Sequence, residues 1–310
     1  MKEVIVTGGA GFIGSNLVER LLLDQNTRVS IFDNLSTGKI QNLPKDNEKC
    51  TFYNIDLVKE RKEWPQIKAS ALFHLAANAD VRGGQTDRQV DYIQNVHVTK
   101  QVCDYARDNL IPKVVFSSSA TVYGEPDTFP TPETALMPQT SVYGASKLAG
   151  EAYIQAYANY GDFSAAIFRF VSWTGPRYSH GVIYDFFNKL EKDSSKLTVL
   201  GDGSQAKSFL HVADGVDAII SISNQVNKGC EIINLGNSEI MKVRDLAKVV
   251  IEEMELKNVD IKYTGGKRGW LGDAPLVQLD IAKALKMGWT PKRNIATSIR
   301  DTVQYLKANR

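Results

Sequence analysis

The sequence Thr7-Gly8-Gly9-Ala10-Gly11-Phe12-Ile13-Gly14 follows a short apolar run at 4–6 and opens an amphipathic stretch at 16–23. Its glycines recur at a three-residue spacing, where a backbone would pass close to a pyrophosphate. The amide groups at the start of the expected helix add a positive pole. The stretch therefore predicts a strand, turn and helix that bind a dinucleotide, with a mere tight turn as the alternative. The candidate contacts are Gly8, Gly11, Phe12, Ile13 and Gly14.

The same rhythm continues beyond this stretch. Short apolar runs at 29–32, 52–55, 71–77, 114–116 and 166–168 alternate with amphipathic patterns, the longest at 89–108 and 142–160. This alternation predicts an α/β fold with a doubly wound parallel sheet. After Phe170, Gly, Pro and Ser interrupt the rhythm and indicate a smaller mixed α/β lobe. We expect residues 1–170 to form the first domain, with 231–256 returning to it, and 171–230 and 257–310 to form the second lobe.

Composition excludes several classes of protein. The 310 residues carry 37 Lys and Arg against 35 Asp and Glu, so a broad nucleic-acid-binding face is not expected. Three cysteines stand far apart without CxxC spacing, and no set of His and acidic residues has metal-ligand spacing, so we expect neither disulfides nor a metal. No leader pattern or long apolar run appears, and a soluble cytoplasmic protein without a membrane partner is the expectation.

An acidic residue supports the dinucleotide prediction. Asp33 ends the second expected strand, 19 residues after Gly14, where a carboxylate can bind both ribose hydroxyls of an adenosine. Neither Asn34 nor Leu35 is basic, and Lys39 is the nearest cation, so a 2′-phosphate would meet negative charge. NAD is therefore favoured over NADP, with Asp33 and Asn34 as contacts.

Further cofactor contacts are expected at the ends of the next two strands, where ligands of open α/β sheets gather. Asp56, followed by Leu57, could accept a hydrogen bond from the adenine amine, and Ala76 and Ala77 are small enough to let a cofactor lie across them. The alternatives are a turn aspartate and ordinary close packing.

The reactive residues are predicted from two segments. Tyr143 and Lys147 are four residues apart, hence on one face of a helix, where an ammonium and a cationic nicotinamide favour the phenolate form of the tyrosine. Two solvated residues on a helix are the alternative. Ser119 ends an expected strand 24 residues before Tyr143, and its hydroxyl could orient a reacting alcohol or carbonyl. Together these residues predict hydride-transfer chemistry with Ser119, Tyr143 and Lys147 as catalytic residues.

At these residues the chain resembles the extended short-chain dehydrogenases/reductases, and within them the NAD-dependent epimerase/dehydratase family of nucleotide-sugar enzymes. The matching segments are 7–14, 33–35, 56, 74–77, 117–124, 143–147, 175–177, 201–203 and 272–273. The resemblance implies a Rossmann domain with tightly held NAD and a C-terminal lobe that binds a nucleoside diphosphate sugar. It also implies that Lys147 holds the nicotinamide ribose and that Asn95 and Phe170 lie near the cofactor. Family members usually form homodimers by pairing two long helices, here 89–108 and 142–160; burial of their apolar faces within one chain is the alternative.

The segment 119–124 lacks the acidic residue of the family's dehydratases and decarboxylases, and it resembles the segment in epimerases that act on UDP-glucose at carbon 4. The resemblance thus implies interconversion of UDP-glucose and UDP-galactose. Another sugar, nucleotide or carbon, a nucleotide-sugar reductase, and a non-enzymatic NAD-sensing protein are the alternatives.

Substrate contacts are also implied by the resemblance. Arg268 fits a diphosphate clamp, with a solvated basic loop as its alternative, and Thr198 lies in the strand whose backbone receives the base. Two positions depart from the family: Ser172 replaces an asparagine that donates to the diphosphate, and Lys207 replaces an arginine. Val277 is expected to border the sugar and to leave room for a 2-acetamido group, or else to pack in the lobe. The remaining candidate substrate contacts are Ser119, Val182 and Asp273.

Overall fold

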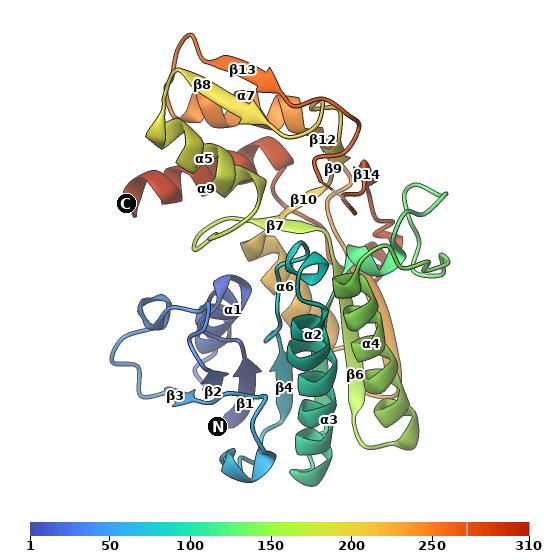
Figure 1. Cartoon of the computed structure of the whole chain (residues 1–310). Helices are drawn as coiled ribbons and strands as arrows, with labels where there is room; N and C mark the ends of the chain where they lie inside the picture. The colour runs from blue at the N-terminus through green and yellow to red at the C-terminus, as the bar shows by residue number, and fades with distance from the viewer. Residues whose placement is uncertain (271, 310) are drawn as a thin grey trace.

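A computed structural model describes residues 1–270 and 272–309 and contains a seven-stranded parallel sheet (Figure 1). The strand order is β11-β6-β5-β4-β1-β2-β3, so the chain starts in the middle of the sheet and winds outward in both directions. This confirms the predicted doubly wound α/β fold. The strands are β1 (Lys2–Thr7), β2 (Thr27–Asp33), β3 (Cys50–Asn54), β4 (Ala71–His74), β5 (Lys113–Ser119), β6 (Ser164–Phe170) and β11 (Cys230–Leu235).

Helices cover both faces of the sheet because its strands are apolar on both sides. In β1, Val4 and Val6 face one core and Ile5 faces the other. The first face is covered by α1 (Phe12–Leu22) and α6 (Val212–Ser223), and the second by α3 (Val98–Asp108) and α4 (Val142–Tyr160). The continuous apolar runs of the sequence follow from this double burial.

Helix α4 agrees with the predicted range 142–160. Its first turn is capped by Ser141, whose Oγ accepts from Gly144 N at 3.0 Å, and it ends at Gly161, which has φ +87°. The predicted helix 89–108 is instead divided into α2 (Arg88–Asp91), a π-helical segment (Tyr92–His97) and α3.

The second lobe lies beyond the carboxyl ends of the large sheet, at the top of Figure 1. Its third core joins α5 (Val182–Lys192), α7 (Val243–Glu253) and α9 (Ile295–Ala308) with the parallel pair β8 (Lys196–Val199) and β13 (Asp260–Tyr263). Its remaining elements are β7 (Ser172–Thr174), β9 (Ala206–Lys207), β10 (Phe209–His211), β12 (Met241–Lys242) and β14 (Leu276–Val277). Helix α8 (Ala282–Lys286), expected in this lobe, packs instead against β11 of the large sheet. In the described chain, no helix is both long and apolar enough to span a bilayer.

Two segments that we expected to lie each in one domain, 231–256 and 171–230, are divided between the large sheet and the second lobe. Strand β11 pairs with β6 in the large sheet, whereas α7 packs with α5 and α9 because Leu246 and Val250 face the third core. Helix α6, expected in the second lobe with 171–230, packs instead against α1 and β6, since Val216 and Ile219 face the first core.

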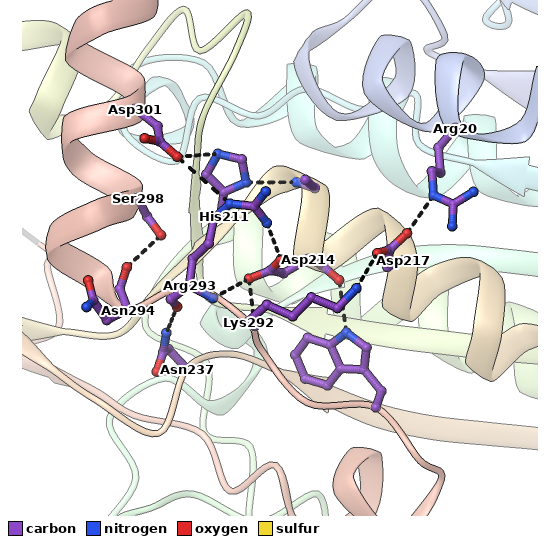
Figure 2. Close-up of polar contacts among 12 residues, drawn as sticks. Arg20, His211, Asp214, Asp217, Asn237, Lys292, Arg293, Asn294, Ser298 and Asp301 are labelled. Carbon is purple, nitrogen blue, oxygen red and sulfur yellow. Dashed lines mark hydrogen bonds and ion pairs between the residues drawn. The ribbon is translucent and has the colours of Figure 1, made fainter. Parts of the chain in front are cut away.

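Polar contacts fix the C-terminal segment to α6 (Figure 2). Asp214 Oδ2 accepts from the backbone nitrogens of Lys292 and Arg293, both at 2.9 Å, and Asp214 also pairs with the Arg293 guanidinium. One turn later, Asp217 pairs with Arg20 of α1 at 2.6 Å and with Lys292 at 3.2 Å. His211 Nδ1 accepts from the backbone of α6, and its Nε2 lies 3.7 Å from Asp301 of α9. These contacts hold the second lobe in place over the sheet.

Candidate active site

The glycine loop after β1 is shaped by two close approaches. Gly8 has φ +69°, and a Cβ there would lie 2.7 Å from Ala76 N, so only glycine lets this loop meet the loop after β4. A Cβ on Gly14 would lie 2.1 Å from Gly8 O. The first turn of α1 is thereby held directly against the loop, as expected from the spacing of the glycines.

The start of α1 is suited to an anion. Its N-cap is Gly11, no side chain caps it, and its first turn contains no acidic residue. The first amide groups are therefore left for a bound group, as the pyrophosphate of a dinucleotide requires. Phe12 and Ile13 are partly buried on this turn and pack against the first core.

Asp33 lies beside this loop at the carboxyl end of β2. Its Oδ2 accepts from Ala10 N at 2.9 Å and its Oδ1 from Leu35 N at 2.8 Å, and its side chain is largely buried. The carboxylate thus connects the glycine loop to the turn after β2. Its negative charge and the uncapped amide groups of α1 fit the ribose and the pyrophosphate of NAD, respectively. Asn34 accepts from Ser36 N at 3.0 Å.

Asp56 lies in a turn, which was the alternative to a role in binding the cofactor. Its Oδ1 accepts from Val58 N at 3.1 Å. It follows β3, next to Asp33, and Ile55 N donates to Asp33 O. Leu57 is buried in the second core. An adenine contact of Asp56 stays a prediction.

A buried chain of hydrogen bonds supports the loop after β4, and sequence reasoning missed it. His74 Nδ1 lies 2.8 Å from Thr7 Oγ1, and His74 Nε2 lies 3.1 Å from Thr99 Oγ1 of α3. Thr7 Oγ1 in turn accepts from Ala76 N at 3.2 Å. Burial and the Lys147 ammonium lower the pKa of His74 to about 3, so its imidazole is neutral. The signal in the sequence was a histidine inside an otherwise apolar run.

Asn95, on the π-helical segment, connects three parts of the site. Its Oδ1 accepts from Asn78 N at 2.8 Å, and its Nδ2 donates to Ser146 Oγ of α4 at 2.8 Å and to Asp91 Oδ1 at 3.3 Å. The residue is buried and supports the loop after β4, which continues from Ala76 and Ala77. Its expected position next to the cofactor stays a prediction.

Ser119, Tyr143 and Lys147 lie together at the carboxyl end of β5. Burial raises the pKa of the Tyr143 phenol to about 12, and a hydrogen bond with Ser119 opposes this rise. Lys147 Nζ donates to Ser117 O at 3.0 Å and lies 5.1 Å from the centre of the Phe116 ring. Burial lowers the pKa of Lys147 to about 8, although the charges of Asp91 and Glu151 oppose this. Tyr143 and Lys147 are both buried, which removes the alternative of two solvated helix residues, and Ser119 is half-buried.

A buried ion pair behind this set was also missed from the sequence. Arg169 of β6 donates Nε to Glu151 Oε1 at 2.9 Å and Nη2 to Oε2 at 2.7 Å, with both side chains at most 1% exposed. Ser118 Oγ donates to the same carboxylate, and Arg169 Nη1 donates to Tyr123 OH at 2.8 Å. Glu151 is one helical turn after Lys147, so the pair connects the reactive face of α4 to the end of β5.

Four of the expected substrate residues lie close together in the second lobe. Lys207 pairs with Asp273, whose other oxygen accepts from Gly269 N at 3.0 Å. Arg268 Nη1 donates to Asp273 O at 2.8 Å, and Val277 of β14 pairs with Lys207 of β9. Arg268 is therefore part of a structured loop, with its guanidinium also paired to Glu125.

The other expected contacts lie on separate elements. Ser172 is exposed on β7, Thr198 is exposed on β8, and Val182 begins α5 half-buried. Phe170 is buried, and its ring centre lies 4.4 Å from that of Trp173. These four residues lie on four different elements, β6, β7, α5 and β8.

The doubly wound sheet, the glycine loop, the acid at the end of β2 and the neighbouring Ser119, Tyr143 and Lys147 define a Rossmann-fold enzyme of the short-chain dehydrogenase/reductase type. A profile of the NAD dependent epimerase/dehydratase family matches residues 4–236. The chain belongs to this family, and its cofactor is NAD.

Proteins to which the chain is similar include epimerases of nucleotide sugars. A putative UDP-glucose 4-epimerase of Methanocaldococcus jannaschii is 34% identical, with 99% of each chain covered. A crystal structure of a UDP-galactose 4-epimerase, also 34% identical, has a TM-score of 0.89 with 99% of each chain covered. The UDP-N-acetylglucosamine 4-epimerase of Methanobrevibacter ruminantium M1, solved with UDP-N-acetylmuramic acid, is 28% identical over both whole chains with a TM-score of 0.90.

Proposed function

We propose that the protein is an NAD-dependent 4-epimerase that interconverts UDP-glucose and UDP-galactose. The observation that carries the proposal is the set of half-buried Ser119 with buried Tyr143 and Lys147 at the carboxyl end of β5, with no carboxylate in the segment 119–124 that follows. The next acidic residue, Glu125, is paired with Arg268, which lowers the pKa of its carboxyl and makes it a weaker base. Such a site supports reversible oxidation of one alcohol rather than dehydration or decarboxylation.

In this mechanism the Tyr143 phenolate takes the proton of the sugar 4-hydroxyl, and Ser119 holds the same oxygen by a hydrogen bond. Lys147 favours the phenolate through its charge and holds the nicotinamide ribose. NAD, when bound at the glycine loop and Asp33, supplies reversible acceptance of the C4 hydride. After the sugar turns its other face, Tyr143 returns the proton to the oxygen and the 4-epimer forms. No second substrate is required.

The second lobe would hold the nucleotide while the sugar stays loosely bound, so that binding energy falls on the diphosphate. Lys207 and Arg268 supply positive charge there, and Asp273 connects them. Ser172, Val182 and Thr198 complete the proposed contacts. Lysine at 207 retains charge without the planar fork of arginine, so its phosphate contact is a point contact.

A second candidate substrate is a UDP-N-acetylhexosamine. Val277 is half-buried beside Lys207, and valine leaves more room next to a sugar than a large aromatic residue would. The similarity to the UDP-N-acetylglucosamine 4-epimerase of M. ruminantium supports this candidate.

We also propose a cytoplasmic homodimer formed by the outer faces of the α2–α3 region and α4. Tyr92 is 58% exposed and Tyr153 is 40% exposed on these helices, so aromatic surface is available to a second copy. Light scattering should give twice the chain mass, and Tyr153→Glu should shift the protein to the mass of one chain. A monomeric parent protein would contradict the dimer.

The proposed function is tested with Tyr143→Phe, which removes only the phenolic oxygen. We expect retained fold and NAD, shown by circular dichroism and by the ultraviolet spectrum, and a fall in turnover of about 100-fold or more. Turnover within about threefold of the parent would contradict the role of Tyr143. Adding a UDP-sugar to the parent should reduce bound NAD transiently, whereas release of reduced cofactor at each turnover would indicate a reductase.

A further inference from the structure

Asp91, the last residue of α2, has a carboxylate that is buried but only half satisfied. Its side chain is 0% exposed. Oδ1 accepts from Asn78 Nδ2 at 2.8 Å and from Asn95 Nδ2 at 3.3 Å, whereas Oδ2 has no hydrogen-bond partner among the residues that the structure describes. A buried carboxylate oxygen without a partner is costly, so its retention calls for a reason other than packing.

The carboxylate faces the first turns of α4. A Cβ built on Gly84 would lie 2.6 Å from Asp91 Oδ2 and 3.3 Å from the Val142 Cβ, so only a glycine separates the orphan oxygen from this helix. The Asn95 amide that contacts Asp91 also donates to Ser146 Oγ, which donates to Tyr143 O at 2.7 Å. Asp91 therefore lies on the side of α4 that carries the reactive residues.

Lys147 needs a negative charge in this region. Its ammonium is buried, and the charges that favour its protonation come from Asp91 on α2 and Glu151 on α4. Glu151 is already paired through both oxygens with Arg169, and His74 on β4 is neutral. In the described chain, Asp91 is thus the buried carboxylate near Lys147 that has no cation of its own.

The charges around Asp91 agree with this arrangement. Burial raises the pKa of Asp91, as do the charges of Asp80 and Asp87, while the hydrogen bond from Asn78 and the Lys147 ammonium hold it down. Asp91 also raises the pKa of Tyr143, which acts against the phenolate, so a benefit of Asp91 to the site comes through Lys147. The carboxylate and the ammonium each favour the charged form of the other in a site closed to water.

We propose that Asp91 is a positioning residue that acts as the counter-charge of Lys147 and keeps its ammonium protonated beside Tyr143. The reaction in which Lys147 takes part is the proposed function above, and the inference rests on it. Asp91 itself need not touch substrate or cofactor.

The test is Asp91→Asn in the full-length protein with its NAD. The orphan oxygen makes this variant specific for charge, because an asparagine carbonyl at the Oδ1 position can accept both existing hydrogen bonds. The titration of Lys147 is followed by the NMR signal of its Nζ, assigned with Lys147→Met. We expect the midpoint to fall by about 1 pH unit or more, the usual effect of losing an opposite charge nearby. The loss of turnover at high pH should begin at correspondingly lower pH, with KM unchanged.

Asp87→Asn is the matched control. It removes one negative charge four residues away, on an exposed side chain that caps α2 by accepting from Gln89 N at 2.9 Å. The Lys147 midpoint should not move in this variant. Asp91→Glu retains the charge and should retain most of the parent pH profile. Asp91→Ser, which removes the charge in a smaller side chain, replaces Asp91→Asn if that variant does not fold.

An unchanged Lys147 midpoint in folded Asp91→Asn, or an equal shift in Asp87→Asn, would overturn the inference. The proposed function fails separately, if Tyr143→Phe and Lys147→Met keep the turnover of the parent. Because the NMR titration does not depend on turnover, the two failures are distinguishable.

Discussion

Arg268 grips Glu125 with both terminal nitrogens of its guanidinium, at 2.6 and 2.8 Å from the two carboxylate oxygens. The two residues are 143 apart in sequence and join the loop after β5 to the second lobe. A guanidinium occupied by a carboxylate is not free for a phosphate, so in the proposed enzyme Glu125 and the diphosphate of the substrate compete for Arg268. Breaking the ion pair as the substrate binds would therefore reduce the net free energy of substrate binding in the proposed enzyme.

Glu125→Gln should therefore tighten substrate binding. Since the pair is about two-fifths exposed, we expect a modest fall in KM for UDP-glucose, about two- to fivefold, with little change in kcat. Arg268→Gln should raise KM. Asp245→Asn, which breaks the exposed pair with Lys248 on α7 of the second lobe, is the control. A higher KM in Glu125→Gln would show that the carboxylate assists binding.

His74 should make the protein sensitive to acid. Burial lowers its pKa from 6.5 to about 3, so between these values the unfolded chain binds a proton that the folded protein does not. The stabilisation by neutral His74 is complete above pH 6.5 and is lost as the pH falls toward 3. In His74→Gln, the free energy of unfolding from urea titrations should depend less on pH between 6.5 and 4.5 than in the parent. The control is His97→Gln, because His97 is exposed and its replacement should leave the pH dependence unchanged. If the free energy of unfolding of His74→Gln depends on pH as steeply as that of the parent, the argument is refuted.

Asp33→Asn should weaken the preference for NAD over NADP. The asparagine can still accept from one backbone amide, but the negative charge that opposes a 2′-phosphate is lost. We expect weaker NAD retention after purification and a smaller ratio of NADP to NAD dissociation constants, measured by calorimetry. Asp46→Asn removes a charge from an exposed turn after β2 and should leave both constants unchanged. If the ratio of the two dissociation constants is unchanged in Asp33→Asn, Asp33 has no role in cofactor preference and serves only to bind the backbone of Ala10 and Leu35.

Val277→Tyr should exclude N-acetylated sugars. If the pocket of the parent accepts UDP-N-acetylglucosamine, added bulk should reduce its kcat/KM relative to that of UDP-glucose by roughly 10–200-fold. Val277→Thr, which has nearly the same volume, should keep the parent's ratio. A parent that ignores the acetylated sugar, or a ratio that does not move in Val277→Tyr, would contradict the role of this position.

Local pattern was sufficient for the large sheet, for α4 and for the glycine loop, because each depends on residues close in sequence. Local pattern was not sufficient for the π-helical segment. The extra residue in its turn places Asn95 toward Ser146, and the apolar periodicity of the sequence changes too little to indicate it. The position of α6 was also missed, since an apolar helix face does not indicate which lobe it packs against.

The polar partners of the site were the least predictable part. Arg169 appears in the sequence as one charge in an apolar strand, and Glu151 as one more acidic residue on a helix. Their pairing depends on the packing of α4 over β6, and nothing in the spacing of the residues specifies it. The sequence predicted Ser119, Tyr143 and Lys147 as reactive residues but not the buried ion pair behind them.

The ion pairs of this protein differ in their access to dissolved salt. Arg169 and Glu151 are sealed from water, whereas Arg268–Glu125 and Lys292–Asp217, which join the second lobe and the C-terminal segment to the large domain, lie at the surface. Counter-ions screen exposed charges within about 8 Å at physiological ionic strength and reach buried ones much less. Concentrated salt should therefore weaken the ion pairs between the lobes more than the buried pair that aligns α4 with β6.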